Sequence, residues 1–259
     1  MNNKSVLRGM MISFMTLFLI ILGCSSNRSM TIDLGDGIKM EMVLINEGTF
    51  TMGSDYDMGE EDESPLRNIT ITKPFYIGKY EVTQEQWKQI MGTNPSQYKG
   101  PKNPVDTVSW NDCRIFLEKL STKTGRQFGL PTEAQWEYSC RAGTTTKWSF
   151  GKTDDKAGEY AWFRDNSQNK THPAGGKKPN MWGLYDMHGN LGEWCSDFYI
   201  NPYSHKDLID PKGPETGDSR VIRGGAWGDS PDNIRSAYRN CNGPDGANDG
   251  IGFRCIMLE

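Results

Sequence analysis

The last forty residues of the chain, 220–259, constrain the fold more than any other stretch. Runs of β-forming residues at 220–223, 234–239 and 251–258 alternate there with loops made almost wholly of Gly, Asp, Asn, Ser, Pro and Ala. Such residues favour turns, because Gly adopts positive φ freely and Asn and Asp bond to their own backbone. Loops framed by short strands commonly carry a protein's functional groups. We therefore expect the functional surface in these loops or in the cleft that they border.

The first residues have the pattern of an export signal. Lys4 and Arg8 precede an apolar run, residues 10–22, which is shorter than a membrane-spanning helix requires. The run ends at a glycine followed by Cys24, which resembles a bacterial lipobox, where cleavage before the cysteine precedes acylation of its thiol and new amine. We predict a lipoprotein signal peptide at residues 1–23 and lipidation of Cys24. A plain secretory signal or an uncleaved anchor is the alternative.

The predicted mature chain starts with the acylated cysteine and a polar tether, residues 24–38, which lead into one domain at residues 39–259. Several acyl chains hold a protein on a membrane stably, whereas one does not. Ser25 after the cysteine favours onward transport to the outer membrane. We therefore expect a bacterial membrane-anchored lipoprotein of the outer membrane or cell surface.

The charge of the chain argues against nucleic acid as a partner. The formal net charge is −4 at pH 7, and loss of Lys4 and Arg8 with the signal peptide makes it more negative. A nucleic-acid-binding domain needs basic side chains that neutralise phosphates. Besides the membrane, the expected partner is an unidentified protein or surface ligand.

The middle of the chain predicts short strands and capped helices. Thr83, Ser109 and Thr132 each stand three residues before a Gln or Asp, the spacing of a capping box at the start of a helix. Glycines at 92, 125 and 143 would end these helices. The expected strands lie within residues 40–53, 68–72 and 75–82. With many glycines and tryptophans besides, the pattern predicts a single α+β domain that is loop-rich, with small sheets and two to three short helices.

Several segments, taken together and in order, resemble the formylglycine-generating enzyme or sulfatase-modifying factor family. They are residues 42–44, 48–53, 80–83, 104–105, 108–110, 130–138, 180–190, 193–197, 223–225 and 252–254. The resemblance covers the chain from about residue 40 to its end. It implies that family's variant of the C-type lectin fold, which is mostly irregular, with two main helices and with N- and C-terminal strands paired.

The oxidase of that family activates O₂ and converts a sulfatase cysteine to formylglycine. It uses two closely spaced thiols after a Gly-Gly pair to bind Cu(I), an ion that soft thiolates suit. Here the corresponding segment, residues 226–234, contains no cysteine. The resemblance therefore implies a member that lacks the oxidase thiol pair, so that copper is not expected and no catalytic residue is assigned. A formylglycine-generating oxidase acting on a sulfatase cysteine is the alternative.

The resemblance also implies disulfides. Family members pair cysteines that correspond here to Cys140 with Cys241 and Cys113 with Cys255. An exported compartment permits such bonds. Cys195 would then remain as a small buried thiol.

A structural calcium ion is a further implication of the resemblance. Family members hold one through a Gly-Asn-x-x-Glu-Trp motif, which Asn190 and Glu193 match here. Ca²⁺ prefers oxygen ligands of this kind in irregular loops. The alternative is that Asn190 caps a turn and Glu193 pairs with a nearby arginine.

The C-terminal loops are the predicted ligand-binding surface. Its residues are Trp227, Gly228, Asp229, Ser230, Asp232, Asn233, Asn240, Asn242, Asn248 and Asp249. One interpretation is a fixed binding module. A second is the variable region of a diversity-generating retroelement protein, whose varied positions would be these residues other than Trp227, together with Gly243, Gly246 and Ala247. The simpler alternative is a turn-rich loop, since Gly, Asn and Asp dominate turns.

Overall fold

The computed structural model describes residues 29–55, 59–203 and 208–258. The predicted signal peptide and Cys24 lie outside these residues. Within them, no helix is long and apolar enough to cross a membrane. The strands are β1 (Ser29–Gly35), β2 (Ile38–Ile45), β3 (Gly48–Met52), β4 (Arg67–Ile71), β5 (Phe75–Gly78), β6 (Phe128–Gly129), β7 (Gly192–Phe198), β8 (Arg220–Arg223), β9 (Arg239–Asn242), β10 (Ile251–Gly252) and β11 (Ile256–Leu258). The helices are α1 (Gln84–Met91), α2 (Trp110–Thr124), α3 (Glu133–Arg141) and α4 (Ala157–Tyr160), with 3-10 turns η1 (Glu61–Glu63), η2 (Asp154–Lys156) and η3 (Pro231–Ile234).

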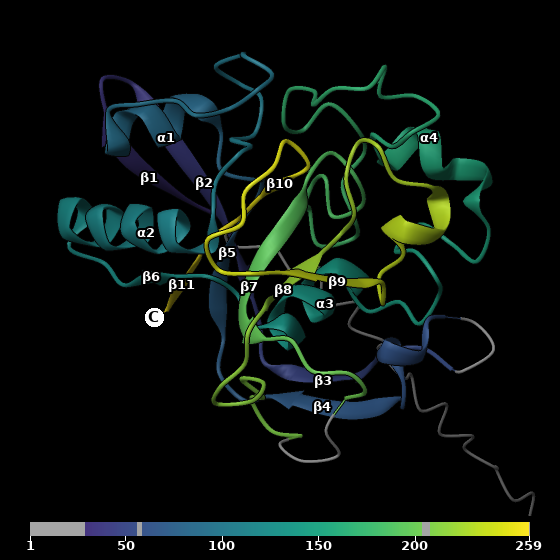
Figure 1. The fold of residues 1–259 in the computed structure, drawn as a ribbon. Coiled ribbons are helices and arrows are strands. Elements are labelled where there is room, and N and C mark those ends of the chain that lie inside the picture. The colour runs from purple at the N-terminus through teal and green to yellow at the C-terminus, as the bar shows by residue number, and fades with distance from the viewer. Residues whose placement is uncertain (1–28, 56–58, 204–207, 259) are drawn as a thin grey trace, which may run out of the picture.

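The two ends of the described chain meet in one five-stranded sheet, in the order β1-β2-β5-β11-β6 (Figure 1). β1 pairs antiparallel with β2, and β11 lies between β5 and β6, antiparallel to both. β1 therefore belongs to the domain. The predicted tether at residues 24–38 is wrong from Ser29 onward, because Ile32 and Leu34 alternate into the core.

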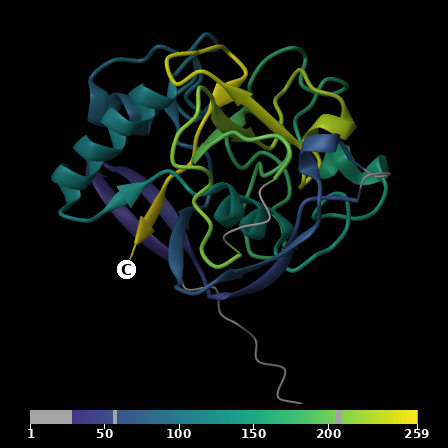
Figure 2. The same cartoon turned by 60° about the horizontal axis from the view of Figure 1, so that its bottom comes forward.

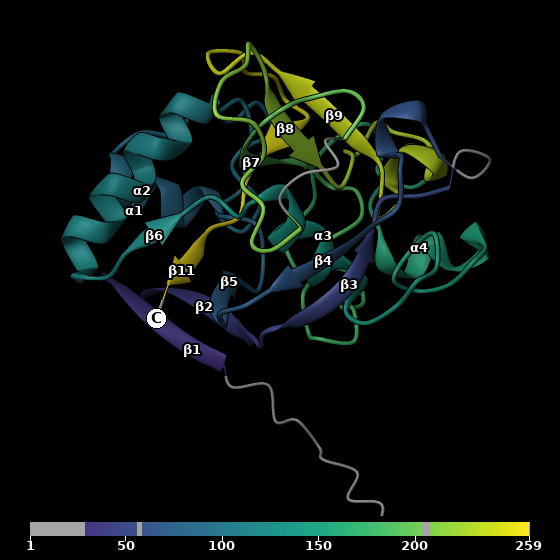
Figure 3. The same ribbon diagram turned by 90° about the horizontal axis from the view of Figure 1, so that it is seen from below.

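A four-stranded sheet, in the order β10-β7-β8-β9, carries the C-terminal loops. β7, β8 and β9 are antiparallel neighbours, while β10 runs parallel to β7. The predicted strand at 234–239 is wrong, because Arg235 turns inward to a buried carboxylate and the strand begins only at Arg239. The predicted run at 251–258 divides into β10 and β11, which belong to different sheets. β3 and β4 form a separate hairpin-like pair below them (Figure 3).

The three predicted capping boxes are all present. In α1, α2 and α3, the side chains of Thr83, Ser109 and Thr132 accept hydrogen bonds from the third residue of the helix, and that residue's side chain accepts from the cap backbone. These bonds satisfy amides that the first turn of a helix leaves free. α1 and α2 end at glycines, as expected, but α3 ends at Ala142 with a φ of 46°, one residue before Gly143.

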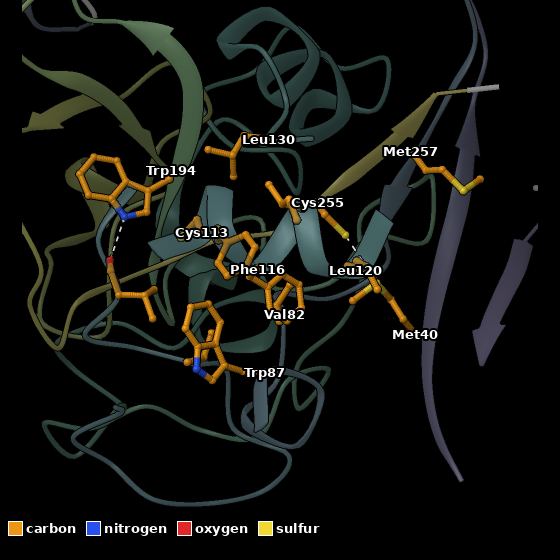
Figure 4. Close-up of a cluster of buried hydrophobic side chains, with 14 of the residues drawn as sticks. Met40, Val82, Trp87, Cys113, Phe116, Leu120, Leu130, Trp194, Cys255 and Met257 are labelled. Carbon is orange, nitrogen blue, oxygen red and sulfur yellow. Dashed lines mark hydrogen bonds between the residues drawn. The ribbon is translucent and has the colours of Figure 1, made fainter. Parts of the chain in front are cut away.

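The main core lies between the five-stranded sheet and helices α1 and α2. The Trp87 ring stacks on the Phe116 ring with centroids 5.2 Å apart (Figure 4). The Phe253 ring lies nearly perpendicular to both. Aromatic pairs in these geometries stabilise a core beyond their buried area alone. α2 contributes Leu117 and Leu120 to the same cluster. This cluster fixes β10 and β11, and therefore the C-terminal end of the loop that precedes β10.

Buried ion pairs fix the C-terminal segment at four further points. Arg235 pairs with Glu63, Arg239 with Glu133 and Arg254 with Glu193, each through two hydrogen bonds of 2.6–3.0 Å. Arg223 contacts Glu137, also in the interior. Such pairs are geometrically specific, because a planar guanidinium matches a carboxylate at two points. The loops between these arginines therefore emerge from a rigid frame.

Neither predicted disulfide is present, since Cys113, Cys140, Cys195, Cys241 and Cys255 are all free thiols. The Cys140 sulfur is directed at the Met187 carbonyl and the His188 ring, whereas Cys241 lies on β9. The Cys255 sulfur lies 3.5 Å from the sulfur of Met40, away from Cys113 (Figure 4). The pairings implied by the resemblance are therefore absent, since the Cys140 and Cys255 sulfurs contact other side chains.

These thiols should differ sharply in reactivity towards iodoacetamide. Cys241 is half-buried, while the other four are at most 1% exposed, and burial raises their pKa values. Because only the thiolate reacts readily, we expect native protein to be alkylated at Cys241 and the buried four only after unfolding. Peptide mapping by mass spectrometry checks this. A Cys140–Cys241 or Cys113–Cys255 linkage in the non-reduced sample would contradict the structure.

Candidate functional site

The C-terminal loops border a polar cleft of about 400 Å³ above the four-stranded sheet. Strands β7, β8 and β10 form its floor. The loop after β8 forms one side, and β9 with the loop that follows it forms the other. The lining residues are Gly192, Ile222, Gly225, Ala226, Trp227, Gly228, Asp229, Asn240, Cys241, Asn242, Asn248, Asp249, Gly250 and Ile251. A volume of this size is typical of small-ligand sites.

A pair of glycines creates the side wall. Gly224 and Gly225 have φ values of 94° and 68°, which other residues rarely adopt. A Cβ on Gly225 would also lie 2.3 Å from the Asn233 carbonyl oxygen. The chain can therefore turn sharply out of β8 only with glycine here, and this turn directs residues 226–229 over the sheet.

Trp227 is the anchored aromatic residue of the cleft. Its backbone amide donates to the Asn190 carbonyl at 2.9 Å, and its indole Nε1 donates to the Asp249 carbonyl at 2.9 Å. The Tyr98 ring meets it edge-on, with centroids 5.6 Å apart. Trp227 thus joins the two C-terminal loops, and Tyr98 supports this junction from the loop after α1.

Two carboxylates lie on the cleft walls. The Asp229 carboxylate accepts a hydrogen bond from the Ala226 amide at 2.8 Å, and burial raises the pKa of Asp229. The Asp249 carboxylate accepts from the Tyr98 hydroxyl at 3.4 Å. Each of these side chains has one oxygen for which no partner is found among the described residues. Both can therefore accept a hydrogen bond from a ligand.

The structure brings together most, though not all, of the predicted binding residues. Seven line the cleft: Trp227, Gly228, Asp229, Asn240, Asn242, Asn248 and Asp249. Ser230, Asp232 and Asn233 do not. They belong to η3 and its cap, where the Asp232 carbonyl accepts from Arg235 and η3 packs beside Trp148. The structure therefore places these three residues outside the cleft, because η3 packs against the domain beside Trp148.

Sequence reasoning missed the residues that come from elsewhere in the fold. Ile222 and Ile251 form an apolar floor, and Cys241 lines the cleft from β9. Tyr98 approaches from 129 positions away from Trp227 along the chain. The pairing of β8 with β9 sets Ile222 opposite Asn240, so alternation along these strands could have placed Ile222 on the face of the predicted asparagines. No local signal indicates that Tyr98 would reach Trp227.

The residues expected to hold calcium do not fit that ion. Both oxygens of Glu193 accept hydrogen bonds from Arg254, and one also accepts from the Trp136 indole at 2.7 Å. The Asn190 carboxamide donates to Glu81 and accepts from the His172 amide. A cation would face a guanidinium at Glu193. Among the described residues, no group of three or more His, Cys, Asp and Glu side chains is arranged to hold a metal.

One buried cluster has the residue types of a nucleophilic site but not its electrostatics. The His188 ring contacts the Ser149 hydroxyl at 2.8 Å and the Cys140 sulfur at 3.7 Å, and its other nitrogen donates to the Ile234 carbonyl. Burial lowers the pKa of His188 to about 4 and raises that of Cys140 to about 12. A weak base beside an un-ionised thiol supports packing rather than nucleophilic catalysis.

Known proteins match this chain over nearly its whole described length. A family model described as the sulfatase-modifying factor enzyme 1-like domain matches residues 36–258. The chain is 27% identical to the chaperone protein LppX of Paenibacillus barcinonensis, over 94% of this chain and 98% of that protein. It is 30% identical to the formylglycine-generating enzyme of Bos taurus, over 83% of this chain and 74% of that enzyme. The solved structure of Treponema denticola variable protein 1 aligns with a TM-score of 0.84 at 29% identity, over 89% of this chain and 99% of that one.

Proposed function

The chain belongs to the sulfatase-modifying factor enzyme 1-like family and has its variant of the C-type lectin fold, and on that premise we propose that it is a membrane-anchored lipoprotein whose domain binds a ligand without oxidising it. One observation carries the proposal. Residues 226–234, where the resemblance places the oxidase thiol pair, contain no cysteine, and residues 226–229 instead form one wall of the polar cleft. Cys241, on β9, is a single thiol whose pKa is raised by burial, and its pairing with Val221 sets its side chain on the other face of the sheet from Ile222.

The position of the cleft supports a binding site that faces away from a membrane anchor. β1, the first described strand, lies on the opposite side of the domain from β9 in two views (Figures 2 and 3). A chain held at its N-terminal end would therefore turn the cleft away from the membrane. The lipobox-like Gly23-Cys24 supports such an anchor, and loss of detergent-phase partition in the Cys24→Ala variant would test it.

Two of the similar proteins support binding as the role. One is named a chaperone and another a variable protein, and neither name describes an oxidase. The likeness to the variable protein favours retroelement diversification of the cleft loops as a finer proposal. The sequences of this protein from closely related isolates would then differ at residues 228–229, 240, 242 and 248–249, while the buried arginines would be the same in all of them. Divergence spread evenly over the chain would contradict diversification and leave the binding role in place.

We expect the purified protein to form no formylglycine. The assay supplies a Cys-x-Pro-x-Arg peptide, copper and O₂, and mass spectrometry follows the loss of the peptide thiol. The reason is the missing thiol pair, without which Cu(I) has no soft ligand set. Bovine formylglycine-generating enzyme in parallel is the positive control. Formylglycine above the level of the enzyme-free reaction would refute the binding proposal in favour of the oxidase.

A further inference from the structure

Three asparagines of the cleft hold their carboxamides in one orientation. The Oδ1 atoms of Asn240, Asn242 and Asn248 accept hydrogen bonds from the backbone amides of residues 241, 243 and 250, at 2.7, 2.8 and 2.9 Å. Because a backbone N–H can bond only to the oxygen of a carboxamide, the nitrogen of each side chain must point the other way. No partner for these three Nδ2 groups is found among the described residues, so the cleft presents three oriented donors.

The same cleft also presents acceptors. Asp229 and Asp249 each use one carboxylate oxygen within the protein, as described above, and the other is available. Among the described residues that line the cleft there is no Lys, Arg or His. An anionic ligand would therefore meet two carboxylates without a cation in the lining, since Arg164, whose charge acts on Asp229, is not a lining residue and pairs with exposed Asp165. A purely cationic group would leave the three carboxamide donors without acceptors.

An extended peptide could satisfy donors and acceptors by adding a strand beside β9, which lies at the edge of its sheet. Strand addition needs free backbone groups along that edge. Here the amides of Cys241 and Gly243 are already bonded by the side chains of Asn240 and Asn242. The edge is therefore capped by its own side chains, which disfavours peptide as the occupant.

From this pattern of donors, acceptors and capped amides, we propose that the cleft binds a neutral, polyhydroxylated ligand, the end of an uncharged glycan chain. Each hydroxyl both donates and accepts, so one sugar ring can satisfy carboxamide nitrogens and carboxylate oxygens together. Trp227 and the apolar floor of Ile222 and Ile251 offer contacts for the C–H faces of the ring. The inference rests on the proposed binding function and names the ligand class of that site.

The test is titration calorimetry of the full mature chain with uncharged di- to hexasaccharides of glucose, galactose, mannose and N-acetylglucosamine. We expect one of these to bind, and the Asn240→Asp, Asn242→Asp and Asn248→Asp variants to bind it about tenfold more weakly or worse. Each change keeps an oxygen that can bond the backbone amide and replaces the donor nitrogen by a charged acceptor oxygen. Asn68→Asp, the same change on exposed Asn68 of β4, is the matched control and should bind as the unaltered chain does.

Other outcomes overturn the inference. These are binding of sulfated or sialylated oligosaccharides alone, binding of a peptide from an extended-peptide library alone, or no binding by any saccharide at millimolar concentration. Unchanged affinity in all three asparagine variants would also refute it, because the donors would then have no role. These failures are distinct from failure of the binding proposal itself, which formylglycine formation alone reveals.

Discussion

Replacing Arg254 by Met should lower the free energy of unfolding by about 3–5 kcal/mol, as expected when one partner of a buried ion pair is removed. Arg254 is fully buried and bonds both oxygens of Glu193, along with the carbonyls of Gly78 and Tyr185. Its loss would leave Glu193 charged in the interior. Urea denaturation followed by tryptophan fluorescence gives the change. Arg114→Met, which breaks an exposed pair with Glu118, is the control and should have little effect.

Two further measurements separate an ion pair from a metal site. Buried Glu81 and Asp186 lie near Arg254, and burial raises the pKa of both. Lower pH should therefore partly restore the Arg254→Met variant by protonating the buried carboxyls. The double variant that carries both Arg254→Met and Glu193→Gln should have a higher free energy of unfolding than the Arg254→Met variant. Strong stabilisation of the unaltered chain by calcium would contradict the ion-pair description.

The parts of the fold that could be predicted are those governed by local chemistry. The helix starts at Thr83, Ser109 and Thr132 follow from capping residues within one turn, and the structure confirms them. The turn-forming loops after β8 and β9 follow from glycine and asparagine content. These features depend on neighbours in sequence, so a single chain is enough to identify them.

The parts that failed depend on long-range contacts. A strand at 234–239 is consistent with the local pattern, yet Arg235 forms an ion pair with Glu63, 172 positions away. The disulfides and the calcium ligands were implied by resemblance alone. The disulfides are absent, and the Cys140 sulfur faces His188 instead. The expected calcium ligand Glu193 is bonded to Arg254. Seven of the ten residues predicted to bind a ligand line the cleft, because loop composition indicates exposure, but composition does not indicate which way η3 folds.

The pH dependence of stability should change clearly when Asp197 is replaced. Burial raises the pKa of this carboxyl from 3.8 to about 7, and the Glu133 charge acts in the same direction. Between about pH 4 and 7 the folded protein therefore keeps a proton that the unfolded chain has released. Each unit of rising pH then lowers the free energy of unfolding by up to about 1.4 kcal/mol, and the contribution stops changing above pH 7, where both states are ionised.

The Asp197→Asn variant removes this titration and keeps an oxygen that can accept from the Glu133 amide. Its free energy of unfolding, minus that of the unaltered chain, should rise steadily from pH 4 to 7 in urea titrations. Asp186, with its pKa raised to about 6, acts in the same direction as Asp197, and His188, with its pKa lowered to about 4, opposes both. Both groups cancel in the difference, since each is present in both proteins. Asp218→Asn, which replaces an exposed acid, is the control. If the difference in free energy of unfolding between Asp197→Asn and the unaltered chain does not change with pH, the Asp197 carboxyl is ionised in the folded protein.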